Sequence, residues 1–108
     1  MINPLKLAEM MSQANQIKEE MQRKLEATVV TGASGGGAIS VTMNGKKQLT
    51  KLRIDPSAVL SLSGSQADVE MLEDLIVAAV NDAGRKAEDA MQDGMKGLLG
   101  GLNLPGLG

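Results

Sequence analysis

The chain has 108 residues, with 11 basic and 13 acidic side chains, a formal net charge of −2, and no His, Cys, Phe, Trp or Tyr. This length predicts one small domain, whose modest core must be built from Leu, Ile, Val, Ala and eight Met. Without Cys, disulfides and thiolate metal sites are excluded, and without a run of about 18 apolar residues we expect no membrane span. The composition therefore indicates a cytoplasmic protein, and the small core favours pairing with a second copy.

The charges are unevenly distributed. Residues 29–56 carry four basic side chains against Asp55 alone, whereas residues 57–108 carry eight acidic and three basic side chains. A local basic patch, rather than the net charge, makes a phosphate-binding surface. The acidic total argues against a polyanionic partner, and the basic segment argues for one locally.

The first predicted element is a long amphipathic helix that begins at Asn3-Pro4, with Asn as the N-cap and Pro at the first helical position. Apolar residues recur at steps of three and four, which is coiled-coil-like spacing. They are Leu7, Met10, Ala14, Ile17 and Met21. A helix of about 23 residues is ~35 Å long, more than a small sheet needs for cover. We expect its N-terminal half to project as an arm; the alternative is that the whole stripe lies in the core.

A short β-prone run at residues 28–31 precedes the glycine-rich segment 32–37. A glycine cluster can cradle a phosphate, but this one lacks the Lys-Ser/Thr ending of a P-loop and precedes a strand pattern rather than a helix. We therefore interpret it as a flexible turn between two strands.

Residues 37–56 have the pattern of a β-hairpin. Apolar and polar residues alternate in the first half, and Asn44-Gly45 is a turn signal because both residues tolerate positive φ. A four-residue loop at 44–47 places Ile39 opposite Leu52 in the return strand.

The two faces of this hairpin are predicted to differ. One is apolar and must be covered, and it comprises Ile39, Val41, Met43, Thr50, Leu52 and Ile54. The opposite face is basic and carries Lys47, Lys51 and Arg53, with Leu49 among them.

After the hairpin, Pro56 starts a short helical turn, and Ser65 followed by Asp68 resembles a capping box. A second long helix is predicted over residues 66–95. Its inward stripe comprises Val69, Leu72, Ile76, Ala79, Val80, Ala83, Ala87 and Met91. Gly84 costs the helix about 1 kcal/mol relative to Ala and marks a close approach or a bend. We divide the chain into a single domain at 1–96 and a Gly/Leu-rich tail at 97–108.

The residue types argue against catalysis and metal binding. Without His or Cys, no nucleophile–base pair can be named, so we do not expect an enzyme. Glu70, Glu73 and Asp74 have the ligand chemistry for a hard cation, but a solvated acidic face near a helix N-terminus suits the macrodipole better. We expect no metal, no cofactor and no small-molecule substrate.

Five short motifs, in order along essentially the whole chain, carry a resemblance to a known family. They are Met-Asn-Gly at 43–45, Ile-Asp-Pro at 54–56, Leu-Glu-Asp-Leu-Ile at 72–76, Ala-Ala-Val-Asn-Asp-Ala at 78–83 and Gly-Gly-Leu-Asn-Leu-Pro-Gly at 100–106. Together with the Met- and Gln-rich first helix and the triple glycine at 35–37, this order resembles the YbaB/EbfC family of bacterial nucleoid-associated proteins.

The resemblance implies an α+β fold in the order α-β-β-β-α, with a small antiparallel three-stranded sheet between two long helices. It implies a tweezer-like homodimer in which the two first helices project as arms. It also implies a protein that binds double-stranded DNA in the cytoplasmic nucleoid and shapes chromatin or affects gene expression.

Phosphate contacts with DNA require Lys and Arg side chains. Candidates are Lys6, Lys18, Arg23 and Lys24 on the first helix and Lys46, Lys47, Lys51 and Arg53 on the hairpin. Stacking on single-stranded bases is unavailable without aromatic residues, which favours the duplex backbone. The alternative interpretation of each basic residue is a solvated surface charge that does not contact DNA. The alternative function is a protein-interaction module whose Met stripe at 10, 11 and 21 grips a partner helix. Steep salt dependence would distinguish DNA binding from such apolar docking.

Overall fold

The computed structural model describes residues 3–101 as two long helices joined by a three-stranded sheet. The elements are helix α1 (Pro4–Ala27), strand β1 (Val29–Ser34), 3-10 turn η1 (Gly35–Gly37), strands β2 (Ile39–Asn44) and β3 (Leu49–Ile54), and helices α2 (Pro56–Leu60) and α3 (Gln66–Gly101). The sheet is antiparallel, in the order β1-β2-β3. The predicted α+β fold and the α-β-β-β-α order are confirmed. Helix α3 continues to Gly101, past its predicted end, and residues 102–108 of the predicted tail lie outside the described residues.

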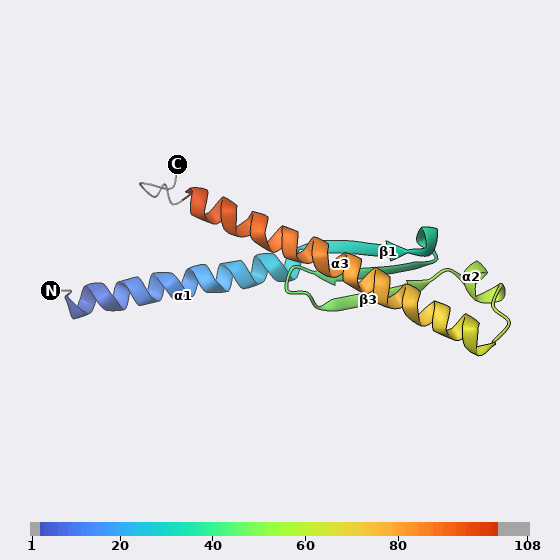
Figure 1. Ribbon diagram of the computed structural model, residues 1–108. Coiled ribbons are helices and arrows are strands. Elements are labelled where there is room, and N and C mark those ends of the chain that lie inside the picture. Colours follow the sequence, from blue (N-terminus) through green and yellow to red (C-terminus); the bar gives the residue numbers. More distant parts are fainter. Residues whose placement is uncertain (1–2, 102–108) are drawn as a thin grey trace.

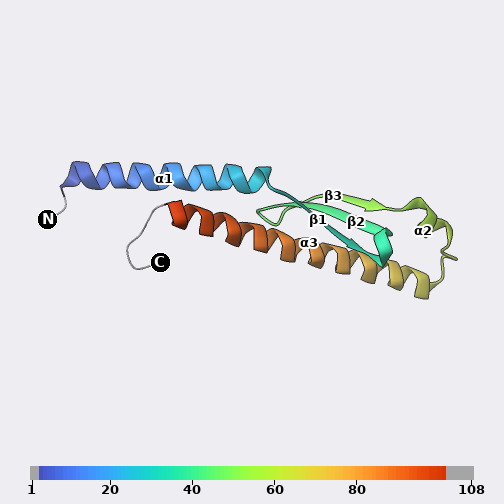
Figure 2. The ribbon, with the colours of Figure 1, turned by 90° about the horizontal axis from the view of Figure 1, so that it is seen from above.

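Helix α1 is an arm that extends from the sheet. It begins as predicted, because the Asn3 side chain accepts a hydrogen bond from the Leu5 N–H at 3.1 Å and Pro4 occupies the first turn. Over Pro4–Ala27, α1 buries no residue, and most of its apolar stripe is exposed. Figures 1 and 2 show α1 and the C-terminal half of α3 leaving the sheet on the same side. The predicted arm is confirmed, and the alternative that its stripe lies in the core is wrong.

The arm makes the molecule elongated, with extents of 72 × 28 × 19 Å and a radius of gyration of 20.8 Å. A compact domain of this length has a radius of gyration of about 13 Å. The accessible surface is 8045 Å², whereas about 5,700 Å² is typical of a compact monomer of this mass. The chain therefore carries an unusually large exposed surface for its size.

The core lies between α3 and one face of the sheet (Figure 2). Its buried side chains are Ile39, Val41 and Met43 of β2 and Ala79, Ala83 and Ala87 of α3. Small alanines let α3 lie close to the strands, and a Cβ added to Gly32 of β1 would lie 2.3 Å from the carbonyl oxygen of Ala79. A Cβ at Gly84 would meet no atom within 4 Å. Of the two expectations for Gly84, a close approach or a bend, the close approach is therefore wrong, and Gly32 makes a close approach instead.

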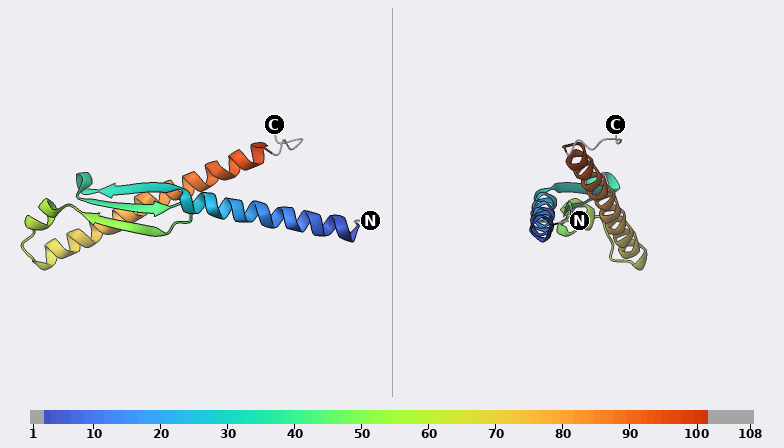
Figure 3. Two further views of the ribbon diagram at one scale, coloured as in Figure 1. Left: turned by 180° about the vertical axis from the view of Figure 1, so that it is seen from behind. Right: turned by 90° about the vertical axis from the view of Figure 1, so that its left-hand side faces the viewer.

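The inward stripe of α3 is otherwise mostly as predicted. Leu72, Leu75, Ile76 and Val80 are partly buried and pack against the core. Leu75 is missing from the predicted stripe. Val69 belongs to that stripe by spacing, yet it is 46% exposed, because α3 extends beyond the strands at this end (Figure 3, left).

The register of the β2–β3 hairpin differs from the prediction, because Ile39 pairs with Ile54 rather than with Leu52. Two features of the hairpin cause this shift of two positions. The tip is a three-residue loop instead of the predicted four-residue loop, because the Asn44 N–H donates to the Gln48 carbonyl oxygen, and this moves the pairing by one position. A bulge in β3 next to the pair Thr42–Lys51 moves it by one more.

The tip is a three-residue loop whose positive φ falls on Lys47 (φ 65°) rather than on Asn44 or Gly45. Such loops place a left-handed residue at their third position. The bulge also moves Leu49, which pairs with Met43 on the core side instead of lying on the basic face. The predicted side of Leu49 is therefore wrong.

Strand β3 is largely uncovered, because α3 packs mainly on β1 and β2. Leu49 and Leu52 lie on the same side of the sheet as the core, yet they are 48% and 43% exposed. The expectation that the whole apolar face is covered is wrong for this strand. An apolar surface beside α3 remains open.

The connection from β3 to α3 is held by local hydrogen bonds. The predicted helical turn forms as α2, with Asp55 as its N-cap. At the start of α3, the Ser65 hydroxyl accepts the Asp68 N–H at 3.2 Å, which is one half of the predicted capping box. The Asp68 carboxylate accepts the hydroxyl and N–H of Ser63 instead of the Ser65 N–H, and these bonds hold the pKa of Asp68 below its usual value.

Candidate nucleic-acid interface

The two lysines at the hairpin tip are engaged with glutamates of the two long helices. Lys46 Nζ lies 3.2 Å from Glu26 Oε1 at the end of α1, and Lys47 Nζ lies 3.5 Å from Glu88 Oε2 of α3. The tip thus lies between the helices, where its positive charge is partly neutralised. Neither glutamate is near these lysines in sequence, so the pairing depends on the tertiary structure.

The four basic residues of α1 are Lys6, Lys18, Arg23 and Lys24, and all are exposed. Within residues 3–101, none of them has a carboxylate within 4.0 Å. At about 100° per residue, Lys6 and Lys24 share one side of the helix, ~27 Å apart along its axis. Lys18 and Arg23 point to two other sides. The arm therefore presents charge around its circumference rather than in one row.

The other two basic residues of the hairpin lie on the face of the sheet that α3 does not cover. Lys51 pairs with Thr42 and Arg53 with Ser40 across the β2–β3 ladder, so their side chains are on the face opposite the core. Among the described residues, no carboxylate lies within 4.0 Å of either cation. This face therefore carries two free positive charges on a surface with small polar neighbours.

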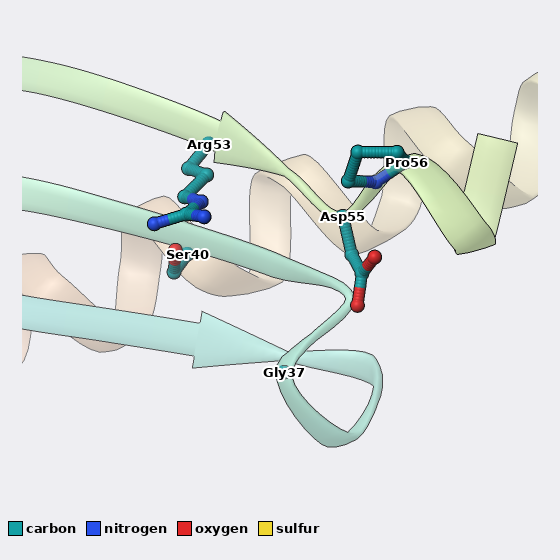
Figure 4. Close-up of a pocket in the computed structure, with 5 residues that line it drawn as sticks. All are labelled: Gly37, Ser40, Arg53, Asp55 and Pro56. Atoms are coloured by element: carbon teal, nitrogen blue, oxygen red, sulfur yellow. The ribbon is translucent and has the colours of Figure 1, made fainter.

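Arg53 lines a cavity of about 330 Å³ at the end of the sheet, together with Gly37, Ser40, Asp55 and Pro56. Figure 4 shows the guanidinium reaching toward Ser40 and the Asp55 carboxylate directed toward the turn at Gly37. A guanidinium and a hydroxyl can together donate hydrogen bonds to a phosphate.

The negative charge of Asp55 limits the negative charge of a ligand that this cavity can bind. The Ser57 N–H and the Ser57 hydroxyl donate to its Oδ1 at 3.0 and 2.9 Å. These hydrogen bonds, with a smaller contribution from Arg53, hold the pKa of Asp55 below its usual value. The carboxylate is thus ionised at neutral pH and opposes an anion at the Gly37 side of the cavity.

The structure separates the eight predicted residues into three groups. Lys46 and Lys47 at the tip form ion pairs with glutamates. Among the described residues, the four arm residues have no carboxylate within 4.0 Å and point to different sides of α1. Lys51 and Arg53 likewise have none, and they lie on the same face of the sheet. Sequence reasoning missed the cavity residues Ser40 and Asp55. The cross-strand pairing that brings Ser40 to Arg53 depends on the bulge and tip length, which the sequence pattern did not reveal.

Other kinds of site have less support in the part of the chain that the structure describes. Over residues 3–101, no group of three His, Cys, Asp or Glu side chains is placed to hold a metal ion. The acidic side chains Glu70, Glu73 and Asp74 are exposed on α3. No helix among the described residues is long and apolar enough to cross a membrane.

Comparisons with known proteins show which family the chain resembles. The family model of the YbaB/EbfC DNA-binding family matches residues 3–102. A nucleoid-associated protein of Acidobacterium capsulatum is 65% identical over 104 residues, covering 96% of each chain. A nucleoid-associated protein of Koribacter versatilis is 48% identical over 100 residues, covering 93% of this chain and 94% of the relative.

A solved structure shares the fold. The crystal structure of uncharacterized protein HP0035 from Helicobacter pylori superposes with a TM-score of 0.71 at 23% sequence identity, covering 92% of this chain and 99% of that chain. The family model and the two relatives span nearly the whole sequence. The chain therefore belongs to the YbaB/EbfC DNA-binding family.

Proposed function

We propose that the protein binds double-stranded DNA as a homodimer, largely through the phosphate backbone, in the cytoplasmic nucleoid of a bacterium. Binding alters the conformation of the DNA or affects gene expression. The observation that carries this proposal is a set of six exposed basic side chains without a carboxylate within 4.0 Å among residues 3–101. They are Lys6, Lys18, Arg23 and Lys24 on the arm and Lys51 and Arg53 on the open sheet face. Lys46 and Lys47 make smaller contributions, because Glu26 and Glu88 already neutralise them.

The uncovered surface beside β3 supports the homodimer. Leu49 and Leu52 of β3 are 48% and 43% exposed, although they lie on the core side of the sheet. Fully burying an exposed side chain of this size contributes roughly 1.5–3 kcal/mol, so covering the exposed half of each contributes about half as much. An isologous interface would use this surface twice, and it leaves the arm and the opposite sheet face open for DNA.

Two-fold symmetry also explains how a chain with a negative net charge can bind negatively charged DNA. A dimer doubles these six cations, and each protomer, which is 72 Å long, carries its own set on the arm and the open sheet face. The acidic side chains of the C-terminal half lie mainly along α3. A chain with a net charge of −2 can therefore still present local positive surfaces to a polyanion.

The proposed contacts favour backbone binding over base reading. The chain has no aromatic side chain to insert between bases. Side chains that reach phosphates fix position without carrying sequence information. We therefore expect little discrimination between duplexes.

A gel-shift titration tests this proposal with unrelated duplexes of equal length at several salt concentrations. The expected result is similar affinity for all duplexes, with each complex containing an even number of chains. Replacing the four arm residues by Gln, or Lys51 and Arg53 by Gln, should weaken binding to every duplex alike. Strong preference for one sequence, or an unchanged affinity in both variants, would overturn the backbone mechanism.

The alternative function is a protein-interaction module, and one observation favours it. Leu7, Met10, Met11 and Ile17 of α1 are 47%, 54%, 62% and 41% exposed. Met side chains adapt to irregular partner surfaces. Apolar docking on α1 should persist at high salt, where phosphate binding is lost. A binding activity that survives high salt and disappears with Met10→Ser and Ile17→Ser would favour this alternative.

A further inference from the structure

We propose that the tip of the β2–β3 hairpin is the joint that sets the direction of the arm, and that Gly45 is its positioning residue. The joint is needed because only Thr28 separates α1 (Pro4–Ala27) from β1 (Val29–Ser34). Helix α1 has no buried residue of its own. Without a further contact, the arm could pivot about this single connecting residue.

The tip supplies that contact through the main chain. The Gly45 N–H lies 2.8 Å from the Leu25 carbonyl oxygen and 3.2 Å from that of Thr28. The last carbonyl groups of a helix have no partner within the helix. The Leu25 carbonyl oxygen accepts the Thr28 N–H only at 3.3 Å, so Gly45 is its closer donor and ties the last turn of α1 to the sheet. The Lys24 carbonyl oxygen accepts the N–H and the hydroxyl of Thr28 at 3.0 and 2.7 Å.

Only glycine fits at this contact. A Cβ at Gly45 would lie 2.9 Å from the Leu25 carbonyl oxygen and 3.1 Å from Leu25 Cα, and both atoms belong to the backbone. Gly45 is also buried, and its φ is not positive. The residue is therefore required by the close approach of the two backbones rather than by a left-handed conformation.

The tip itself is held rigidly. Asn44 is 7% exposed, and its Oδ1 accepts the N–H groups of Lys46 and Gln48 at 2.9 and 3.1 Å. Its Nδ2 donates to Gln48 Oε1 at 2.8 Å. The Lys46–Glu26 ion pair then adds a second, exposed connection between the tip and the arm. The arm is thus fixed to a well-ordered turn at two points.

Small rotations at this joint have large effects at the far end. A helix of 24 residues is about 36 Å long, so a tilt of about 10° moves its N-terminus by ~6 Å. Successive base pairs rise by about 3.4 Å. Such a tilt therefore displaces Lys6 by nearly two base pairs, without changing any charge. This consequence rests on the proposed DNA binding, whereas the joint itself does not.

Distances between two spin labels test the joint without DNA. The chain has no native Cys, so labels can be attached through Ser12→Cys on α1 and Asn81→Cys on α3, both exposed positions. Labelled chains are mixed with a large excess of unlabelled chain, so that each assembly reports one pair. Gly45→Ala is compared with Gly84→Ala, whose added Cβ meets no atom within 4 Å. Lys46→Gln removes the ion pair without adding bulk.

We expect one narrow distance distribution in the parent chain and in Gly84→Ala. Gly45→Ala should shift it by roughly 4 Å for a tilt of about 10°, and Lys46→Gln should broaden it. An unchanged distribution in a folded Gly45→Ala chain would overturn the joint. If Gly45→Ala does not fold, the Lys46→Gln chain tests the joint in its place. An unchanged distance distribution in Lys46→Gln would then overturn the joint.

Duplex affinity then separates a positioning role from a purely structural one. Measured well below the melting temperature, Gly45→Ala should bind DNA more weakly, on the order of tenfold, although all basic residues remain. Gly84→Ala should bind like the parent chain. If the arm moves while affinity is unchanged, Gly45 has no positioning role in DNA binding. If the parent chain does not bind DNA at all, the proposed function fails and the label distances alone decide the joint.

Discussion

The Asp82 carboxylate of α3 accepts a hydrogen bond from the main-chain N–H of Ala33 at 3.1 Å, and so covers part of the outer edge of β1. Lys86, one turn along α3, donates to the Thr31 carbonyl oxygen at 3.0 Å and pairs with Asp82 at 3.2 Å. Exposed strand edges invite pairing with other chains. Because the edge of β1 is covered by side chains of α3, the uncovered apolar surface of the sheet lies on the β3 side.

The Asp82 contacts predict how stability depends on pH. The Ala33 N–H and then Lys86 hold the pKa of Asp82 below its usual value of 3.8. The folded state therefore binds this proton more weakly than the unfolded state, so the stabilisation is present above about pH 4 and is lost as the pH falls below it. Asp82→Asn should lower the melting temperature at pH 7 and have a shrinking effect toward pH 3. Asp89→Asn, at an exposed position of the same helix, is the control. An Asp82→Asn effect that is constant over this pH range would contradict the assignment.

Gly32 is predicted to be the least replaceable glycine of the core. Gly32→Ala places a Cβ 2.3 Å from the Ala79 carbonyl oxygen and 2.5 Å from the Ala83 nitrogen, so α3 must move away from β1. We expect a loss of about 3 kcal/mol in the free energy of unfolding. Gly84→Ala should gain about 1 kcal/mol from helix propensity. Urea unfolding monitored by circular dichroism measures both, and equal stability of the two variants would show that α3 does not approach β1 as closely as described.

Leu52 is predicted to act in the dimer rather than in the core of one chain. Because it is 43% exposed in the protomer, Leu52→Asp should leave the protomer folded but place a charge in the proposed interface. Sedimentation equilibrium at micromolar concentration should give a dimer for the parent chain and an 11.2 kDa monomer for the variant. Lys51→Asp, on the opposite face of the same strand, is the matched control and should remain dimeric. A monomeric parent chain would exclude the proposed dimer.

Two pairs of basic residues on the hairpin allow a comparison of two variants that change the net charge equally. Lys51→Gln with Arg53→Gln removes two free cations, whereas Lys46→Gln with Lys47→Gln removes two that already face Glu26 and Glu88. Both double variants lose the same net charge. The first should flatten the slope of log affinity against log salt by about 0.9 for each phosphate that the variant no longer neutralises, and the second should change it less. Equal slopes for the two variants would mean that only net charge matters.

The sequence predicted the elements better than their pairing. Asn3-Pro4 located the start of α1, and the alternation at 39–43 located β2, because capping and periodicity are local signals. The register failed because it depends on the left-handed Lys47 and on a bulge in β3. Neither has a strong signature in residue type.

The candidate site was less predictable than the fold. Its eight basic residues were visible in the sequence, but their environments were not. The contacts of Lys46 with Glu26 and Lys47 with Glu88 join residues 20 and 41 positions apart. The role of Gly45 was also hidden, because its turn signal suggested positive φ, whereas it fits a close backbone contact. Such features depend on how the helices meet the sheet.

The most direct measurement of the central claim is fluorescence anisotropy of a labelled duplex at a series of salt concentrations. The parent chain is compared with a variant in which the six basic residues of the proposed DNA-binding surface are replaced by Gln: Lys6, Lys18, Arg23, Lys24, Lys51 and Arg53. Backbone binding predicts that log affinity falls linearly with log salt for the parent chain, and that the variant binds weakly with a much flatter slope. Salt-independent binding by the parent chain, or the same slope in the variant, would contradict DNA binding through these side chains.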